Sequence, residues 1–199
     1  MKVYWSVLSK IIQASFATIA LYRTNFWSGL VLGLFWMFWA VAGTRVYFLH
    51  TDSINGWSYG ETLLVLGVFF TLNGFRHSLI TPNVSRLSEY VRTGQLDFLL
   101  LKPLNSQFLV SCNYINIHDL VNIVYGVAIV LFGMSEIGIG LFSVSTFIKF
   151  LISLVCGFMI LYSFSLILHS LAIFYVNVQE ADLFIQNLLE AGRFPVDIY

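Results

Sequence analysis

One apolar part of the sequence carries side chains that can exchange protons. His118 and Asp119 are adjacent, Asn116 and Asn122 lie close to them, and Arg76 ends an earlier apolar run. A histidine beside a carboxylate can act as a general base. Adjacent residues of a helix, however, point about 100° apart, and no nucleophile motif accompanies the pair. A small intramembrane enzyme that uses His118 and Asp119 is therefore one hypothesis.

Two other interpretations need no catalysis. Ionisable groups within a membrane helix are costly and usually face the helix bundle or a polar cavity. Arg76, His118 and Asp119 could satisfy one another inside a bundle, near its cytoplasmic end. Alternatively, they could line a polar path for a solute. The predicted intramembrane polar residues are Arg76, Asn116, His118, Asp119 and Asn122.

Several other kinds of site have no motif in this chain. There is no GxxxxGK[ST] loop for ATP, no HExxH and no Cys/His spacing for a metal. We therefore predict no catalytic, cofactor-binding or metal-binding residue. The formal net charge is +0, which does not favour nucleic acid as a partner. Cys112 and Cys156 lie in or beside apolar runs, so we expect free thiols.

A polar segment, 82–108, separates two apolar runs. We expect Thr81 to cap a helix that has Pro82 at its first position. Glu89 and Arg92 are three residues apart and can pair on one helical face. Gly94 suits a left-handed cap. The segment therefore predicts two short helices at a membrane surface. It contains the densest basic cluster of the chain, namely Arg86, Arg92 and Lys102.

Composition identifies the class of protein. The 199 residues are 58% hydrophobic and 10% charged, whereas a soluble domain is about 25% charged. Apolar runs of about 20 residues can each cross a bilayer as a helix. The sequence therefore predicts an all-α, polytopic membrane protein that forms one domain, 1–199.

The predicted elements follow from the apolar periodicity. Lys2–Arg23 has an apolar and a polar face, as an interfacial helix does, and Gly29 and Gly33 form a GxxxG motif for helix contact. The segments are an amphipathic helix at 2–23, spans near 27–49, 62–80, 109–133 and 147–176, a cytoplasmic loop at 82–108 and a cytoplasmic tail at 177–199. Basic residues gather before the first span and in segment 82–108, so the positive-inside rule places the N-terminus in the cytoplasm.

The polar segment also carries a resemblance. Glu89 and Arg92, then Gly94-Gln-Leu-Asp97, then Leu100-Leu-Lys102-Pro103-Leu104 resemble the first intracellular loop of ABC-2 type exporter permeases. The bacterial ABC-2 family transporter proteins are the most similar group. The stretch Gly192-Arg193-Phe194-Pro195, with Ile198-Tyr199 after it, also resembles the sequence before the fifth span of that family.

The resemblance implies a function. Such permeases lie in the bacterial inner membrane, pair as homo- or heterodimers and dock two cytoplasmic ATPase subunits. ATP then binds to the partner, and the permease is neither an enzyme nor a cofactor-binding protein. Hydrolysis by the ATPase drives substrate export. The coupling residues carried over are Arg86, Glu89, Arg92, Gly94, Leu96, Asp97, Lys102 and Pro103.

The number of spans departs from this pattern. The family has six spans, whereas four are predicted here, so we expect a gene truncated at its C-terminal end, a second reading frame that supplies the rest, or a fragment. The alternative function is a truncated, non-transporting membrane partner or remnant that still docks the ATPase.

Overall fold

The computed structural model describes residues 2–21, 23–138, 144–171, 174 and 181–195. These residues are almost entirely helical, and four of the helical stretches are long and apolar enough to cross a membrane. The prediction of an all-α, multi-pass membrane protein is therefore confirmed. The four stretches are Phe26–Tyr47, Tyr59–Arg92, Ile117–Ile137 and Phe147–Ser170.

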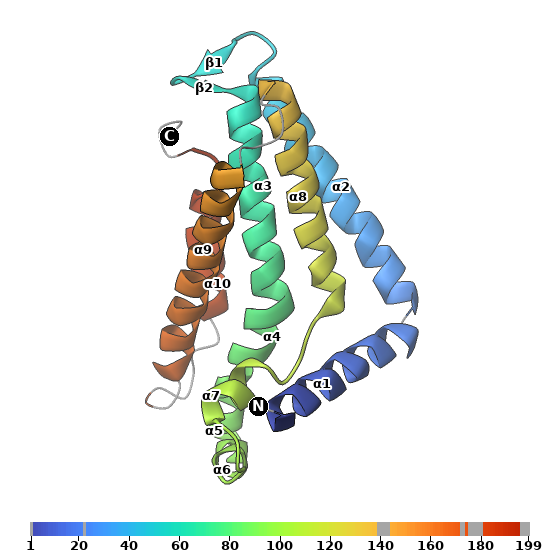
Figure 1. Ribbon diagram of the computed structural model, residues 1–199, viewed down its shortest axis with the longest axis vertical. Helices are drawn as coiled ribbons and strands as arrows, with labels where there is room; N and C mark the ends of the chain where they lie inside the picture. Colours follow the sequence, from blue (N-terminus) through green and yellow to red (C-terminus); the bar gives the residue numbers. More distant parts are fainter. Residues whose placement is uncertain (1, 22, 139–143, 172–173, 175–180, 196–199) are drawn as a thin grey trace.

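The long helices run side by side, with a β-hairpin at one end of the bundle and three short helices at the other (Figure 1). The hairpin consists of β1 (Ser53–Ile54) and β2 (Trp57–Ser58), and a π-helical turn, η1 (Arg76–Ile80), joins α3 to α4. The helices are α1 (Lys2–Leu21), α2 (Arg23–Tyr47), α3 (Tyr59–Phe75), α4 (Thr81–Val84), α5 (Arg86–Arg92), α6 (Gln95–Leu100), α7 (Ser106–Ser111), α8 (Ile117–Ile137), α9 (Val144–Ser170) and α10 (Ala181–Ala191).

The predicted amphipathic helix at 2–23 is present as α1. It lies at an angle to the long helices, across the end of the bundle opposite the hairpin (Figure 1). Its Trp5 and Phe16 side chains are 74% and 59% exposed. Large exposed apolar side chains on one helix suit the interface of a bilayer, where the predicted location of α1 would put them.

The connection between the first two predicted spans contains a β-hairpin. Asn55 and Gly56 have φ angles of 50° and 86°, as a type I′ turn requires at both central positions. The Asn-Gly dipeptide is the sequence signal for this turn. Ser58 then starts α3 with a capping box, in which its hydroxyl accepts from the Glu61 N–H and the Glu61 carboxylate accepts from the Ser58 N–H. Such a cap contributes about 1 kcal/mol.

The second span does not end where we predicted. Thr81 does not cap a new helix with Pro82 at its first position; instead, the helical backbone continues as far as Arg92. The turn η1 lies directly before Pro82, and the Thr81 N–H bonds to the Arg76 carbonyl, five residues earlier. Proline lacks an N–H, and its ring crowds the preceding turn, so a locally wider turn lets the helix pass through it.

The pair α3 and α8 is held together by glycines at seven-residue spacing. These are Gly60, Gly67 and Gly74 on α3 and Gly126 and Gly133 on α8. A Cβ on Gly67 would lie 2.8 Å from the Gly126 carbonyl oxygen, and one on Gly133 would lie 2.9 Å from that of Gly60. The two backbones therefore touch directly, as small residues permit in membrane helices. Seven-residue spacing keeps them on one side of both helices.

The predicted GxxxG contact is confirmed, with α8 as the partner of α2. A Cβ on Gly33 would lie 2.7 Å from the Tyr125 ring, and one on Gly29 would overlap the His118 imidazole. The Tyr125 hydroxyl also donates to the Leu30 carbonyl at 2.9 Å. Because small residues let the helices approach, the tyrosine can reach the backbone of α2.

The third span begins later than predicted. Helix α8 starts at Ile117 rather than at residue 109, and the preceding residues, 112–116, are not helical. Asn83 of α4 holds this connection, since its amide donates to the Tyr114 carbonyl at 2.6 Å and its side-chain oxygen accepts from the Tyr114 N–H at 2.7 Å. The asparagine thus supplies backbone partners that a helix would otherwise provide.

Part of the predicted cytoplasmic tail, 177–199, forms the helix α10. Within the described residues, α10 runs back along α9 towards the hairpin end (Figure 1). Its residues Leu188 and Leu189 line a groove together with Leu64 of α3 and Lys149 of α9. Ile185 is 1% exposed, so one face of α10 packs against the bundle. The predicted end of the fourth span near Val176, and the tail residues 177–180 and 196–199, lie outside the described residues.

Candidate functional site

Helices α5, α6 and α7 form a small lobe, residues 86–111, at the end of the bundle opposite the hairpin (Figure 1). Its core consists of Leu87, Leu99, Leu109 and Val110, with Tyr90, Leu96, Leu104 and Phe108 packed against them. Fully burying such a side chain contributes about 1.5–3 kcal/mol. The lobe is therefore a packed unit, and α5 joins it to the helical stretch of the second span.

A left-handed turn reverses the chain between α5 and α6. Gly94 has φ 71°, which confirms the cap predicted at this residue. The Thr93 N–H donates to the Glu89 carbonyl at 2.9 Å, and the Gly94 N–H donates to that of Val91 at 3.3 Å. Because only glycine adopts this backbone without strain, Gly94 determines where α6 begins.

The charged residues predicted for coupling lie on the outside of this lobe. Glu89 and Arg92 are exposed, but they form no ion pair within 4.0 Å, so the pairing predicted for them is wrong. The Arg86 guanidinium lies over the Tyr114 ring, 5.2 Å from its centre. The predicted residues that are exposed are Arg86, Glu89, Arg92, Gly94, Asp97, Lys102 and Pro103, whereas Leu96 is half-buried.

The tip of the lobe carries apolar side chains that the sequence reasoning did not identify as a surface. Phe98 is 70% exposed and Leu101 is 81% exposed. Leu99, between them, turns inward to the lobe core. Two large apolar side chains surrounded by charges have the composition of the centre of a protein interface. The signal was in the sequence, because α6 is apolar on more faces than one short helix can bury.

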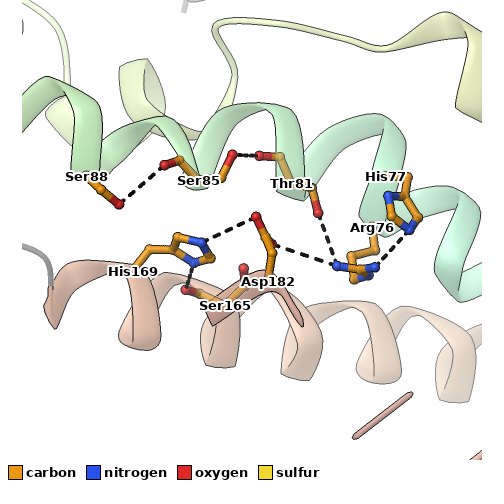
Figure 2. A network of polar contacts seen from close by, with 8 residues as sticks. All are labelled: Arg76, His77, Thr81, Ser85, Ser88, Ser165, His169 and Asp182. Carbon is orange, nitrogen blue, oxygen red and sulfur yellow. Dashed lines mark hydrogen bonds and ion pairs between the residues drawn. The ribbon is translucent and has the colours of Figure 1, made fainter. Parts of the chain in front are cut away.

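A second site lies deep between α3, α9 and α10, around Arg76 (Figure 2). The Arg76 side chain is 2% exposed, and its Nη1 lies 3.8 Å from Oδ1 of Asp182. His169 Nε2 lies 3.6 Å from the other oxygen of the same carboxylate. His77 Nε2 lies 2.8 Å from Arg76 Nη2. The Asp182 carboxylate of α10 thus lies close to the guanidinium of Arg76 from η1 and to the imidazole of His169 from α9.

The geometry assigns the imidazole protons. Arginine can only donate, so His77 accepts at Nε2. His169 Nδ1 lies 2.9 Å from the Ser165 carbonyl, which can only accept, so Nδ1 carries a proton. If Nε2 also carries one, the imidazolium faces the Asp182 carboxylate. Arg76 Nε and Asp182 Oδ1 have no hydrogen-bond partner, so the buried network is only partly satisfied.

The other predicted polar residues form a separate cluster at the start of α8. Asp119 accepts from the side-chain amides of Asn116 at 2.6 Å and of Asn122 at 3.3 Å. His118 Nδ1 lies 3.5 Å from Asp119 Oδ1. In the interpretation that needs neither catalysis nor a solute path, Arg76 would contact His118 and Asp119, but Arg76 pairs with Asp182 of α10 instead, while His118 and Asp119 lie together in the α8 cluster. No group of three metal-ligating side chains occurs in the part of the chain that the structure describes.

A family model described as ABC-2 family transporter protein matches residues 34–199. The chain belongs to this family. It is therefore the membrane-spanning permease component of an ABC transporter. Searches of curated proteins and of solved structures found no match.

Both sites of this ABC-2 family transporter protein lie within the matched residues, whereas α1 precedes them. Helix α1 contacts the lobe through Tyr4, whose hydroxyl accepts from the Asn105 N–H at 3.3 Å and whose ring meets Phe108 edge-on.

Sequence reasoning missed Asp182 and His169. An ionisable side chain in an apolar run, such as His169, requires a partner, and that requirement was the available signal.

Proposed function

We propose that this protein is the permease subunit of a bacterial exporter and that the lobe formed by α5–α7 docks the ATPase. The permease pairs with a second permease subunit, identical or homologous, in the inner membrane. ATP binding and hydrolysis on the docked subunits switch the spans between inward- and outward-facing arrangements. The family membership and the shape and surface of the lobe support this proposal.

The charge distribution supports a cytoplasmic lobe and N-terminus. The start of α2 and the lobe lie at the same end of the bundle (Figure 1). Basic residues at this end include Lys10, Arg23, Arg86, Arg92 and Lys102, whereas Arg45 lies at the hairpin end, in the last turn of α2. Basic residues accumulate on the cytoplasmic side of membrane proteins. The opposite end, with Asp52 and Glu61 in its hairpin connection, then faces the outside.

The observation that carries the proposal is the exposed apolar tip, Phe98 and Leu101, on a lobe with its own core. If a groove of the ATPase covers these two side chains, their burial stabilises the complex. The surrounding charges, Glu89 and Arg92 among them, would then set orientation and the rate of encounter rather than most of the affinity. Since α5 continues α3, force applied to the tip reaches the second span directly.

The test is capture of the ATPase encoded nearest to the gene, together with the ATP hydrolysis that the permease stimulates. We expect Phe98→Ala and Leu101→Ala to weaken capture about tenfold or more each, because exposed anchors of this size contribute at least about 1.4 kcal/mol. Glu89→Lys and Arg92→Glu should weaken capture at low salt and less at high salt.

Leu49→Ala is the matched control, because Leu49 is 61% exposed but lies beside the hairpin. It should leave capture unchanged. Equal capture by the parent, Phe98→Ala and Leu101→Ala would refute docking through this lobe. Absence of capture by the folded parent would refute the permease–ATPase pairing itself.

A further inference from the structure

A ladder of polar contacts runs along one side of the helix that carries the lobe (Figure 2). The Ser88 hydroxyl in α5 donates to the Ser85 carbonyl at 3.4 Å, and the Ser85 hydroxyl donates to the Thr81 carbonyl. Arg76 Nη1 then donates to the Thr81 hydroxyl at 3.3 Å. The ladder connects the first helix of the lobe to the buried guanidinium.

Beyond Arg76 the contacts pass to the last described helix. Asp182 of α10 pairs with Arg76, and His169 at the end of α9 faces the same carboxylate. These partners lie about a hundred residues further along the chain. The position of Arg76 is thus the place where the lobe-bearing helix, α9 and α10 meet (Figure 2).

The turn η1, which begins at Arg76 and leads to the lobe-bearing helices, is π-helical. A π-helical turn holds one residue more than an α-helical turn, and such turns are common at functional sites. Conversion of η1 to α-helix would rotate α4 and α5 by about 100° relative to α3, because one residue of an α-helix turns the chain by that angle. Such a rotation would also displace the Arg76 side chain that pairs with Asp182.

The network is poorly explained as a source of stability alone. Arg76 Nε and Asp182 Oδ1 are buried without hydrogen-bond partners, and the ion pair spans 3.8 Å. An apolar pair of similar size would fill this place at lower cost, since a buried ion pair rarely repays its desolvation.

We infer that Arg76 and Asp182 are positioning residues that link movement of the lobe to the position of α10. When the ATPase turns the lobe, η1 changes its pitch, and the Arg76–Asp182 pair carries α10 with it. This inference rests on the proposed docking of the ATPase. It assigns to α10 a role in the transport cycle that follows from its contact with Arg76.

The test measures a distance within the permease–ATPase complex. Spin labels are placed at Gln186 on α10 and at Val127 on α8, both of them exposed, in a background with Cys112→Ala and Cys156→Ala. Helix α8 is the reference, because the glycine contacts tie it to α3. We expect the distance to change between the nucleotide-free complex and the complex trapped with ATP and vanadate.

Asp182→Asn and Arg76→Gln should abolish this change, while the ATPase is still captured. Glu190→Gln is the matched control, because Glu190 is an exposed carboxylate of the same helix, and it should retain the full change. The double variant Arg76→Gln/Asp182→Asn removes both charges of the ion pair together. It therefore tests the inference even where a single variant fails to fold.

The outcomes separate the two proposals. Captured ATPase with the full change in the double variant would overturn the link, and so would captured ATPase with no change in the parent. Failure of the parent to capture the ATPase would refute the proposed function, and this inference with it. Loss of the change in the variants alone, with capture intact, is the result that supports the link.

Discussion

Gly126→Ala is the sharpest test of the contact between α3 and α8. The new Cβ would lie 2.5 Å from the Thr71 backbone nitrogen and 2.7 Å from the Gly67 carbonyl oxygen. It would also lie 2.3 Å from the Thr71 hydroxyl, which can rotate away. The two backbone atoms cannot move separately, so the added methyl group must push the helices apart.

The structure sets the size of this effect. Cβ atoms essentially never approach another heavy atom within 3.0 Å, so the backbones must separate by about half an ångström at Gly126. Overpacking of this kind costs about 1–3 kcal/mol. Alanine returns up to about 1 kcal/mol through its higher helix propensity. We expect a net loss of about 1–2 kcal/mol, which would lower Tm by about 2–8 °C.

Gly43→Ala is the matched control. Gly43 lies in α2, and a Cβ there would have no neighbour within 4 Å. Helix propensity alone then acts, so this variant should be as stable as the parent or more stable by up to about 1 kcal/mol. Both variants are compared with the parent by thermal unfolding in the same detergent, followed by size-exclusion chromatography. A Gly126→Ala variant that unfolds at or above the temperature of Gly43→Ala would refute direct backbone contact.

Two further predictions concern the lobe and the connection that follows it. Gly94→Ala should destabilise the lobe by about 1–2 kcal/mol, because φ 71° strains any residue with a Cβ; limited proteolysis would show faster cleavage between α5 and α6, and unchanged cleavage would contradict the prediction. Burial raises the pKa of the Cys112 thiol above its ordinary value, so less thiolate is present at neutral pH. Maleimide should therefore label Cys112 more slowly than glutathione at pH 7 and faster as pH rises, with Cys112→Ser as the background; labelling as fast as glutathione would be the contrary result.

Local features of the fold were predictable from the sequence. The spans follow from runs of apolar residues, since burial in lipid depends only on the length and polarity of a segment. Gly94 could be placed because a left-handed turn leaves few alternatives to glycine. The resemblance in segment 82–108 is consistent with the family match, but whether its residues couple to an ATPase stays a prediction.

Two predictions from the sequence were wrong, each for an identifiable physical reason. Because proline favours the first turn of a helix, we predicted that a new helix begins at Thr81–Pro82. The helical backbone instead continues through the π-helical turn η1, which lies directly before the proline. The predicted third span, 109–133, ran through residues 112–116, whereas Asn83, about thirty residues earlier, holds these residues in a non-helical path. In both cases the local sequence pattern did not show the feature that decided the backbone path, namely the π-helical turn before Pro82 and the hydrogen bonds from Asn83.

The sequence by itself determined that this chain is a helical membrane protein with four long apolar helices, because hydropathy and helix geometry act over one segment at a time. Only the tertiary structure decided which residues meet. The spacing of Gly60, Gly67 and Gly74 shows a small-residue face but does not name α8 as its partner. Likewise, Arg76 requires a counter-charge, and only the fold of α10 against α3 and α9 shows that Asp182 provides it. Pairings between distant segments depend on how whole helices pack, and no single segment contains that information.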